Sequence, residues 1–436
     1  MKRNILKDLT NWKNRERRKP LIVRGARQIG KTWAIQEFAK HNYESFIKID
    51  LEKNIELHSV FENDLDPQNI ISSLEIALNQ RIIQGETLLF IDEIQACPRA
   101  IQALRYFYEE MPKLHVITAG SLLEFALSDI SFPVGRVQLL YMFPLNFYEY
   151  LCAIGKDQLA QKIKEKPCEL PTVIHNMLLE ELKKYFFIGG MPECVTAYIK
   201  TKSLLEAFEV QSEIIETYRQ DFSKYGIRID TTCLNEILSR TAEQVGEQIQ
   251  YTKLDSHHTG PTNKKAFDLL CLARVLSKVP ACTQGKNPLG GSVNHKKFKA
   301  LVLDIGLMQR LNQLPVHVEM EHADLLDIYR GKLAEQFVGQ ELKQIGSAEL
   351  FYWARDKIGS EAEVDYIIQN SQGEIVPIEV KSGAAGSLKS LHSCLKTFPE
   401  IKKGFILCSG KYKELAEQKI TFVPLYYAES IFSHIG

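Results

Sequence analysis

GARQIGKT, at residues 25–32, is the stretch that decides the fold of the first part of this chain. It matches the pattern G-x-x-x-x-G-K-[ST], and it lies between a short apolar run at 21–23 and a helical segment that begins near Lys31. In such a loop the glycines let backbone N–H groups surround phosphates, and the helix N-terminus adds its dipole. Lys31 is then expected to act on the β- and γ-phosphates, and Thr32 to ligate Mg²⁺. The residues predicted to bind nucleotide here are Gly25, Ala26, Arg27, Gln28, Ile29, Gly30, Lys31 and Thr32.

A second motif follows the apolar run at 88–91, which ends in the acids Asp92 and Glu93. Asp92 is predicted to hold the Mg²⁺ of the nucleotide, and Glu93 to orient and activate the attacking water as a catalytic residue. A strand that ends in acids also occurs without any such role. The strand-like run at 46–49 comes between these motifs. It favours the P-loop class in which another strand separates the lysine strand from the acidic strand, and disfavours small-molecule kinases.

Three more residues are candidates for this site. Thr118 and Ser121 follow the next strand-like run, and each is expected either to contact the γ-phosphate or water, or to cap a helix. Arg136 is expected to be either a catalytic arginine that stabilises charge in the transition state or a plain surface arginine. A catalytic Arg136 can serve its own subunit or a neighbouring one, and the second case implies a homo-oligomer.

Length and composition limit what the whole chain can be. It has 436 residues, of which 45% are hydrophobic and 25% charged, so two to four globular domains are expected at roughly 100 to 200 residues each. Lysine plus arginine equals aspartate plus glutamate at 54, so no overall charge points to nucleic acid or membrane. No run approaches the roughly 18 apolar residues of a membrane span. Nine dispersed cysteines without a C-x-x-C pair predict reduced thiols in the cytoplasm.

The segment pattern predicts an α/β protein in four parts. Residues 1–170 alternate apolar runs with amphipathic segments, which indicates a parallel sheet covered by helices, and 171–230 form a helical lid or linker interrupted by Gly-Gly-Met-Pro at 189–192. Residues 231–325 fit a winged-helix-like region, and 326–436 a second α/β domain. The histidines at 257 and 258 are expected to face solvent. The basic residues of the third part are expected either to face DNA or to be ordinary exposed side chains: Lys264, Lys265, Arg274, Lys278, Lys296, Lys297 and Lys299.

Further stretches join the first two motifs in one family pattern. They are LLFIDEIQ at 88–95, TAGSLLEF at 118–125, PVGRVQLLYMFPLNFYEYL at 133–151 and GGMPECV at 189–195. With GARQIGKT, they resemble the AAA-type P-loop ATPases of bacteria and archaea that carry a C-terminal domain of unknown function. The resemblance covers essentially the whole chain. It implies ATP binding and ATP hydrolysis, and it favours ATP over GTP.

A second site is predicted in residues 326–436. The runs 363–368 and 375–380, joined by turn residues at 370–373, indicate a hairpin that puts Glu379 and Lys381 on one face and can bring Asp365 beside them. Two carboxylates can hold Mg²⁺ or Mn²⁺, and the lysine can orient or deprotonate water for attack on a phosphodiester. Glu335, in a helix predicted over 332–344, is a further candidate ligand. This arrangement of catalytic and metal-binding residues resembles the PD-(D/E)xK nuclease core.

Two functions fit both sites. In the first, an ATPase controls a nuclease-like domain that cuts DNA or RNA with a second Mg²⁺ or Mn²⁺. In the second, a nucleotide-dependent switch uses the C-terminal domain to bind protein or nucleic acid without cutting. The alternative to a nuclease-like core is an amphipathic hairpin whose Glu379 and Lys381 pair on a solvated face. A kinase is a third possibility that Glu93 argues against.

Overall fold

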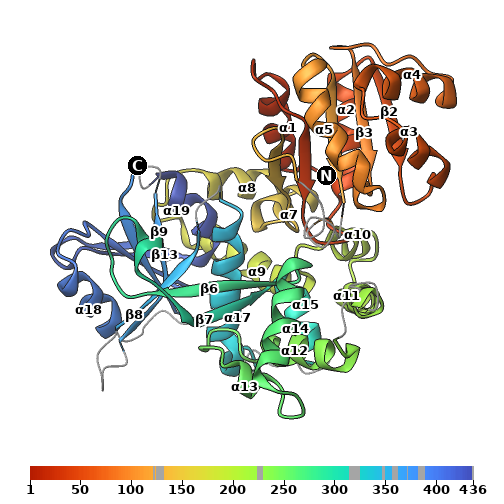
Figure 1. The fold of residues 1–436 in the computed structure, drawn as a ribbon. Helices are drawn as coiled ribbons and strands as arrows, with labels where there is room; N and C mark the ends of the chain where they lie inside the picture. Colours follow the sequence, from red (N-terminus) through yellow and green to blue (C-terminus); the bar gives the residue numbers. More distant parts are fainter. Residues whose placement is uncertain are drawn as a thin grey trace. The chain divides into compact units, whose positions relative to one another are not determined.

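The computed structural model describes residues 1–120, 123, 132–222, 229–313, 325–345, 349–355, 362–370, 372–381 and 388–434. The chain divides into two compact units, Lys2–Phe143 and Pro144–Gly436. Each unit contains its own β-sheet (Figure 1). Over the described ranges, no helix is long and apolar enough to cross a membrane.

The sheet of the first unit has five parallel strands. They are β1 (Leu21–Arg24), β2 (Ser45–Asp50), β3 (Thr87–Asp92), β4 (His115–Ala119) and β5 (Gln138–Tyr141), in the spatial order β2-β3-β4-β1-β5. Strands β1, β3 and β4 are buried along their whole length, as expected where helices cover both faces of a parallel sheet. The predicted parallel α/β fold of this part is therefore confirmed.

Within the described part of this unit, five α-helices connect these strands or precede them: α1 (Ile5–Lys13), α2 (Lys31–Asn42), α3 (His58–Glu62), α4 (Pro67–Leu78) and α5 (Pro98–Glu110). Their starts have clear local causes. The Asp66 side chain accepts hydrogen bonds from the backbone N–H groups of residues 68 and 69, and both α4 and α5 begin with a proline, which suits the first helical turn. Because all strands run the same way, the loops after β1 and β3 lie at one edge of the sheet.

The strand order also identifies the class of this sheet. Strand β4 lies between β1 and β3, so another strand does separate the lysine strand from the acidic strand. The predicted P-loop class is right, but the separating strand is β4, whereas the run at 46–49 belongs to β2 on the outer side of β3. The chain passes β3 before it returns to fill the gap beside β1, an order that hydropathy alone does not reveal.

The second unit begins with a group of helices. They are α7 (Phe147–Ala153), α8 (Asp157–Lys164), α9 (Thr172–Ile188), α10 (Pro192–Thr201), α11 (Leu204–Asp221), α12 (Thr231–Glu243), α13 (Tyr251–Leu254) and α14 (Gly260–Leu272). A further helix, α15 (Ile305–Leu311), comes later in the chain, between strands of the sheet described next. Gly189 and Gly190 join α9 to α10 in a crowded place. A Cβ on Gly190 would lie 1.9 Å from the carbonyl oxygen of Leu145, and one on Gly189 would lie 2.1 Å from Oδ1 of Asp304. The glycines are thus required by packing.

An eight-stranded mixed sheet follows, with helices α17 (Leu325–Lys343), α18 (Lys389–Thr397) and α19 (Ala428–His434) (Figure 1). Its strands are β6 (Leu276–Cys282), β7 (Val293–Val302), β8 (Phe351–Ala354), β9 (Glu363–Gln369), β10 (Ile375–Val380), β11 (Gly404–Cys408), β12 (Lys413–Leu415) and β13 (Ile420–Pro424). The order is β12-β13-β11-β10-β9-β8-β6-β7. Strands β9 and β10 pair antiparallel, which confirms the predicted hairpin.

The β6–β7 hairpin belongs to this sheet. The sequence placed its residues in the middle region, but β6 pairs in parallel with β8 and so continues the C-terminal sheet. Helices α12, α13 and α14 precede the hairpin, and the winged-helix assignment of this segment stays a prediction. The hairpin brings side chains of β7 next to those of β9 and α17, and this placement decides the chemistry of the second site.

Candidate functional site

The loop from β1 to α2 curls tightly around the side chain of Lys31. Gly25 has no room for a side chain, because a Cβ there would lie 2.4 Å from the carbonyl oxygen of Met142. Gly30 has a φ of 89° and forms the N-cap of α2, a left-handed conformation that favours glycine. Lys31 is only 8% exposed, and its ammonium donates to the carbonyl oxygens of Gly25 at 2.9 Å and Ala26 at 2.7 Å. The lysine therefore points into the loop.

Asp92 ends β3 beside the start of α2. Its Oδ2 accepts a hydrogen bond from Oγ1 of Thr32 at 2.9 Å and lies 2.9 Å from Nζ of Lys48 on β2. The carboxylate is almost fully buried. A hydroxyl and a carboxylate oxygen are ligands that Mg²⁺ prefers, so this pair fits the ion that the sequence predicts. Lys48 was not predicted, and the only sequence signal for it is a charge within an apolar run.

Glu93 follows in a conformation that non-glycine residues rarely adopt. Its φ and ψ are 48° and 45°, and such left-handed residues cluster at functional sites. The Gln95 side chain donates to Oε2 of Glu93 at 2.6 Å, which fixes the orientation of this carboxylate. Thr118 on β4 is fully buried, and its hydroxyl has no hydrogen-bond partner among the described residues. Ser121 lies outside the described residues.

Arg136 is placed at the other edge of the sheet. Gln138 at the start of β5 pairs with Leu21 at the start of β1, whereas the nucleotide loop follows the far end of β1, about 13 Å away at roughly 3.3 Å per residue. Nε of Arg136 bonds Oε1 of Glu109 at 2.6 Å, near the end of α5. The structure therefore does not bring Arg136 to the loop of its own chain.

The second site is built around a buried lysine. Nζ of Lys299, on β7, lies 2.8 Å from Oε1 of Glu335, 2.5 Å from Oε1 of Glu363 and 3.4 Å from Oδ1 of Asp365. The Lys299 side chain is only 3% exposed. The expectation that Lys299 is an exposed or DNA-facing side chain is wrong, because the hairpin turns it towards α17 and β9. Neither Lys299 nor Glu363 was predicted to belong to this site.

Asp365, Glu379 and Lys381 lie together as the hairpin prediction required. Oδ2 of Asp365 accepts from the backbone N–H of Val380 at 2.8 Å, and Nζ of Lys381 donates to Oε1 of Glu379 at 2.6 Å. Glu379 is buried, and its Oε2 has no hydrogen-bond partner in the described part of the chain. The pair of Glu379 and Lys381 is therefore not on a solvated face.

Burial and excess negative charge raise the pKa values of two acids in this cluster. Burial, with the nearby charge of Asp365, raises the pKa of Glu335 to about 8 and that of Glu379 to about 7. Burial alone would lower the pKa of Lys299, but the surrounding carboxylates outweigh it and raise that pKa. Three carboxylates around one ammonium leave a net charge of −2 if all are ionised. The lysine is thus firmly charged, and one acid gains from binding a proton.

The structure lends no support to the second metal site, which stays a prediction. Over the described ranges, one group of three potential ligands has its ligand atoms within 4.8 Å of one another, and it is Cys233, Asp255 and His258. The carboxylates of the C-terminal site are not in this group, and three of them contact Lys299. His258 is half-buried and lies 2.6 Å from Asp255, so the expectation that it faces solvent is wrong.

Comparison with known proteins identifies the domain that holds the first of these sites. Residues 17–151 match the family described as an AAA domain. The chain carries an AAA P-loop ATPase domain. Residues 179–317 match a domain of unknown function (DUF8612), and residues 330–428 match another (DUF4143). The AAA domain contains the whole loop and the acidic strand end, whereas the C-terminal cluster draws Lys299 from one domain of unknown function and its carboxylates from the other.

Solved structures resemble the chain only coarsely. The Walker-type ATPase PABY2304 of Pyrococcus abyssi is 15% identical, with a TM-score of 0.44, over 70% of this chain and 94% of that one. The RuvB Holliday junction branch migration motor of Thermotoga maritima is 16% identical, with a TM-score of 0.30, over 68% of this chain and 93% of that one. A comparison with curated proteins returns no match. The assignment of the AAA domain therefore rests on the family match and on the loop geometry.

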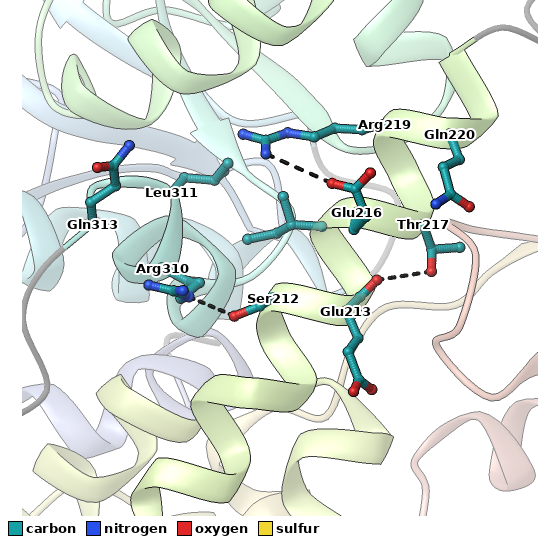
Figure 2. Close-up of a pocket in the computed structure, with 10 residues that line it drawn as sticks. Ser212, Glu213, Glu216, Thr217, Arg219, Gln220, Arg310, Leu311 and Gln313 are labelled. Carbon is teal, nitrogen blue, oxygen red and sulfur yellow. Dashed lines mark hydrogen bonds and ion pairs between the residues drawn. The ribbon is translucent and has the colours of Figure 1, made fainter.

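A pocket of about 800 Å³ lies between α11 and α15, apart from the C-terminal cluster. Figure 2 shows that both arginines of its lining are engaged with neighbours: Arg310 donates to Oγ of Ser212 at 2.7 Å, and Arg219 lies 4.0 Å from Glu216. The lining combines both charges with neutral groups, so it indicates no particular ligand. Its lining residues are Ser212, Glu213, Ile215, Glu216, Thr217, Arg219, Gln220, Arg310, Leu311 and Gln313.

Proposed function

We propose that the AAA domain binds Mg²⁺-ATP and hydrolyses it. The observation that carries the proposal is the contact of Thr32 with Asp92 at 2.9 Å, which joins the start of α2 to the end of β3. This contact places a hydroxyl and a carboxylate side by side at the edge where the loop lies. Mg²⁺ bound there would neutralise charge on the phosphates.

The other residues of the loop edge receive roles that follow from their positions. Backbone N–H groups of residues 25–30 and the start of α2 would hold the phosphates, and Lys31 would turn from the loop carbonyls to the β- and γ-phosphates. Glu93 would orient and activate the attacking water, in a position set by Gln95. Lys48 would hold the Asp92 carboxylate in place beside Thr32.

Arg136 fits a role on a neighbouring subunit. Its place at the far edge of the sheet supports action on another copy's nucleotide, since an arginine finger can be supplied in trans. This would make the protein a homo-oligomer, with each site completed by its neighbour. On its own chain, Arg136 would only pair with Glu109.

Nucleotide binding tests the ATP proposal. Lys31→Ala should reduce binding of a fluorescent ATP analogue by at least about tenfold, because the loop loses the ammonium that contacts the phosphates. Lys40→Ala, an exposed lysine on the same helix, should leave binding unchanged. Equal binding by the wild type and Lys31→Ala would refute the assignment of this loop.

For the C-terminal domain we propose binding of a protein or nucleic acid without cleavage, under control of the nucleotide state. The order of α17, β8, β9, β10, α18 and β11 is consistent with a nuclease-like scaffold. Lys299 supports the non-cleaving role, because its ammonium takes the place between Glu335 and Asp365 where a cleaving site needs a metal. A scaffold of this kind can bind without cutting.

Metal-dependent cleavage is the second candidate function, favoured by the gathering of Asp365, Glu379 and Lys381. Nicking of plasmid, single-stranded DNA and RNA with Mg²⁺ or Mn²⁺, with and without ATP, separates the two. The non-cleaving proposal expects no cut in the wild type. Cleavage that disappears in Lys381→Ala while ATP turnover persists would overturn it and establish a nuclease.

A further inference from the structure

The contacts of Lys299 resemble those of a bound cation. One ammonium with three donor hydrogens contacts three carboxylates, Glu335 on α17 and both Glu363 and Asp365 on β9. Oxygen atoms from several side chains around one positive charge are also what a divalent metal requires. The lysine side chain is almost inaccessible to water, so solvent does not compensate this charge.

We propose that the Lys299 ammonium is the resident cation of the C-terminal carboxylate cluster and keeps a divalent metal out of it. The proposal rests on the non-cleaving role of this domain, and it gives a physical reason why the cluster binds no divalent metal. Removal of the ammonium would turn the cluster into a latent site for Mg²⁺ or Mn²⁺. Its ligands would be Glu335, Glu363 and Asp365, with Glu379 next to them.

The charges explain why a divalent metal is excluded while the Lys299 ammonium is present and is bound once the ammonium is removed. With Lys299 present, the three carboxylates and the ammonium already bond each other, and a metal would have to enter beside a buried positive charge, which repels it strongly at short range in a low-dielectric interior. Without Lys299, three carboxylates face one another, and a divalent ion relieves their repulsion. One of them, Asp365, also holds the backbone N–H of Val380, which fixes its orientation.

Titration of the full chain with Mn²⁺ in the absence of nucleotide, with free Mn²⁺ measured by electron paramagnetic resonance, tests the proposal. Lys299→Met should gain a Mn²⁺ site that binds at least about tenfold more tightly than any C-terminal binding in the wild type. Lys296→Met, an exposed lysine on the same strand, is the matched control and should gain none. Lys299→Met with Asp365→Asn should lose the gained site, which assigns it to this cluster and not to the AAA domain.

Two outcomes would overturn the inference. One is a wild-type Mn²⁺ site that Glu379→Gln or Asp365→Asn removes, and this measurement does not depend on the folding of Lys299→Met. The other is a folded Lys299→Met protein with no added Mn²⁺. If Lys299→Met folds only with Mn²⁺, a melting temperature that rises with Mn²⁺ in the variant and not in the wild type supports the proposal. Cleavage assays are separate, so Mn²⁺ bound without cutting leaves the non-cleaving role intact.

Discussion

Lys48 holds its ammonium 2.9 Å from Oδ2 of Asp92, the carboxylate oxygen that also accepts the Thr32 hydroxyl. This ion pair joins β2 to β3 at the edge of the sheet where the nucleotide loop lies. A buried carboxylate is costly without a charge partner, and carboxylate oxygens are ligands that Mg²⁺ prefers. The AAA domain thus positions its proposed metal ligand with a lysine that lies outside both sequence motifs.

Lys48→Met should therefore weaken the use of Mg²⁺ by the AAA domain. We expect the Mg²⁺ concentration for half-maximal ATP turnover to rise by about tenfold, equal to about 1.4 kcal/mol, because Asp92 loses its charge partner. A Mg²⁺ titration of turnover measures this. Lys53→Met, an exposed lysine shortly after β2, is the control. An unchanged Mg²⁺ requirement in Lys48→Met would show that the ion pair has no part in metal binding.

Asp304→Asn should destabilise the second unit. Oδ1 of Asp304 accepts from the backbone N–H groups of Gly306 and Leu307, and Oδ2 accepts from that of Gly190. Asparagine keeps one oxygen and turns an N–H donor towards another donor, which costs about 1–3 kcal/mol for buried groups. Urea unfolding measures the loss. Asp230→Asn, an exposed helix cap, should cost little, and equal midpoints for both variants would argue against this role of Asp304.

The raised pKa of Glu335 predicts a pH dependence of stability. Its pKa is about 8 in the folded protein, against an ordinary 4.5. Between these two pH values the folded protein keeps a proton on Glu335 that the unfolded chain releases. The free energy of unfolding should therefore fall as pH rises from about 5 to 8, by at most about 1.4 kcal/mol per unit. Glu335→Gln cannot ionise and should show a smaller fall in urea unfolding, whereas the exposed Glu349→Gln should follow the wild type. Parallel profiles for the wild type and Glu335→Gln would contradict the assignment.

Arg136 and Glu93 should complement each other between chains. The Arg136→Ala protein keeps Glu93 but lacks the arginine, and the Glu93→Gln protein keeps Arg136 but lacks the glutamate. Each protein alone should therefore turn over ATP slowly. A mixture should regain turnover that neither protein has alone, because Glu93→Gln chains supply the arginine to sites with an intact Glu93. Phosphate release from mixed and separate samples measures this. A mixture no faster than the sum of its parts would exclude action in trans.

The nucleotide loop could be predicted from sequence because its chemistry is local. The glycines, Lys31 and Thr32 lie within eight residues, and the strand before them and the helix after them fix the shape of the loop. The hairpin of β9 and β10 could be predicted in the same way, because the alternation of side chains along each strand and the turn residues between the strands define its two faces. Both features depend on neighbours in sequence.

The remaining site residues depend on contacts that sequence neighbours do not reveal. Lys299 meets Glu335 only because β6 pairs with β8, which attaches the hairpin to a sheet whose other strands come later. Lys48 meets Asp92 through the pairing of β2 with β3. Arg136 stood next to a strand in the sequence, but its end of that strand lies far from the loop. Strand order and direction, rather than motif content, decided these cases.

ATP turnover by Glu93→Gln tests the central claim most directly. The wild type should release phosphate from ATP in a Mg²⁺-dependent reaction, and Glu93→Gln should release it at least about a hundredfold more slowly, because the residue that activates water is lost. The variant should still bind ATP with unchanged affinity, while Lys31→Ala should fail to bind. Equal turnover by the wild type and Glu93→Gln, or no ATP binding by the wild type, would contradict the assignment of ATP hydrolysis to this site.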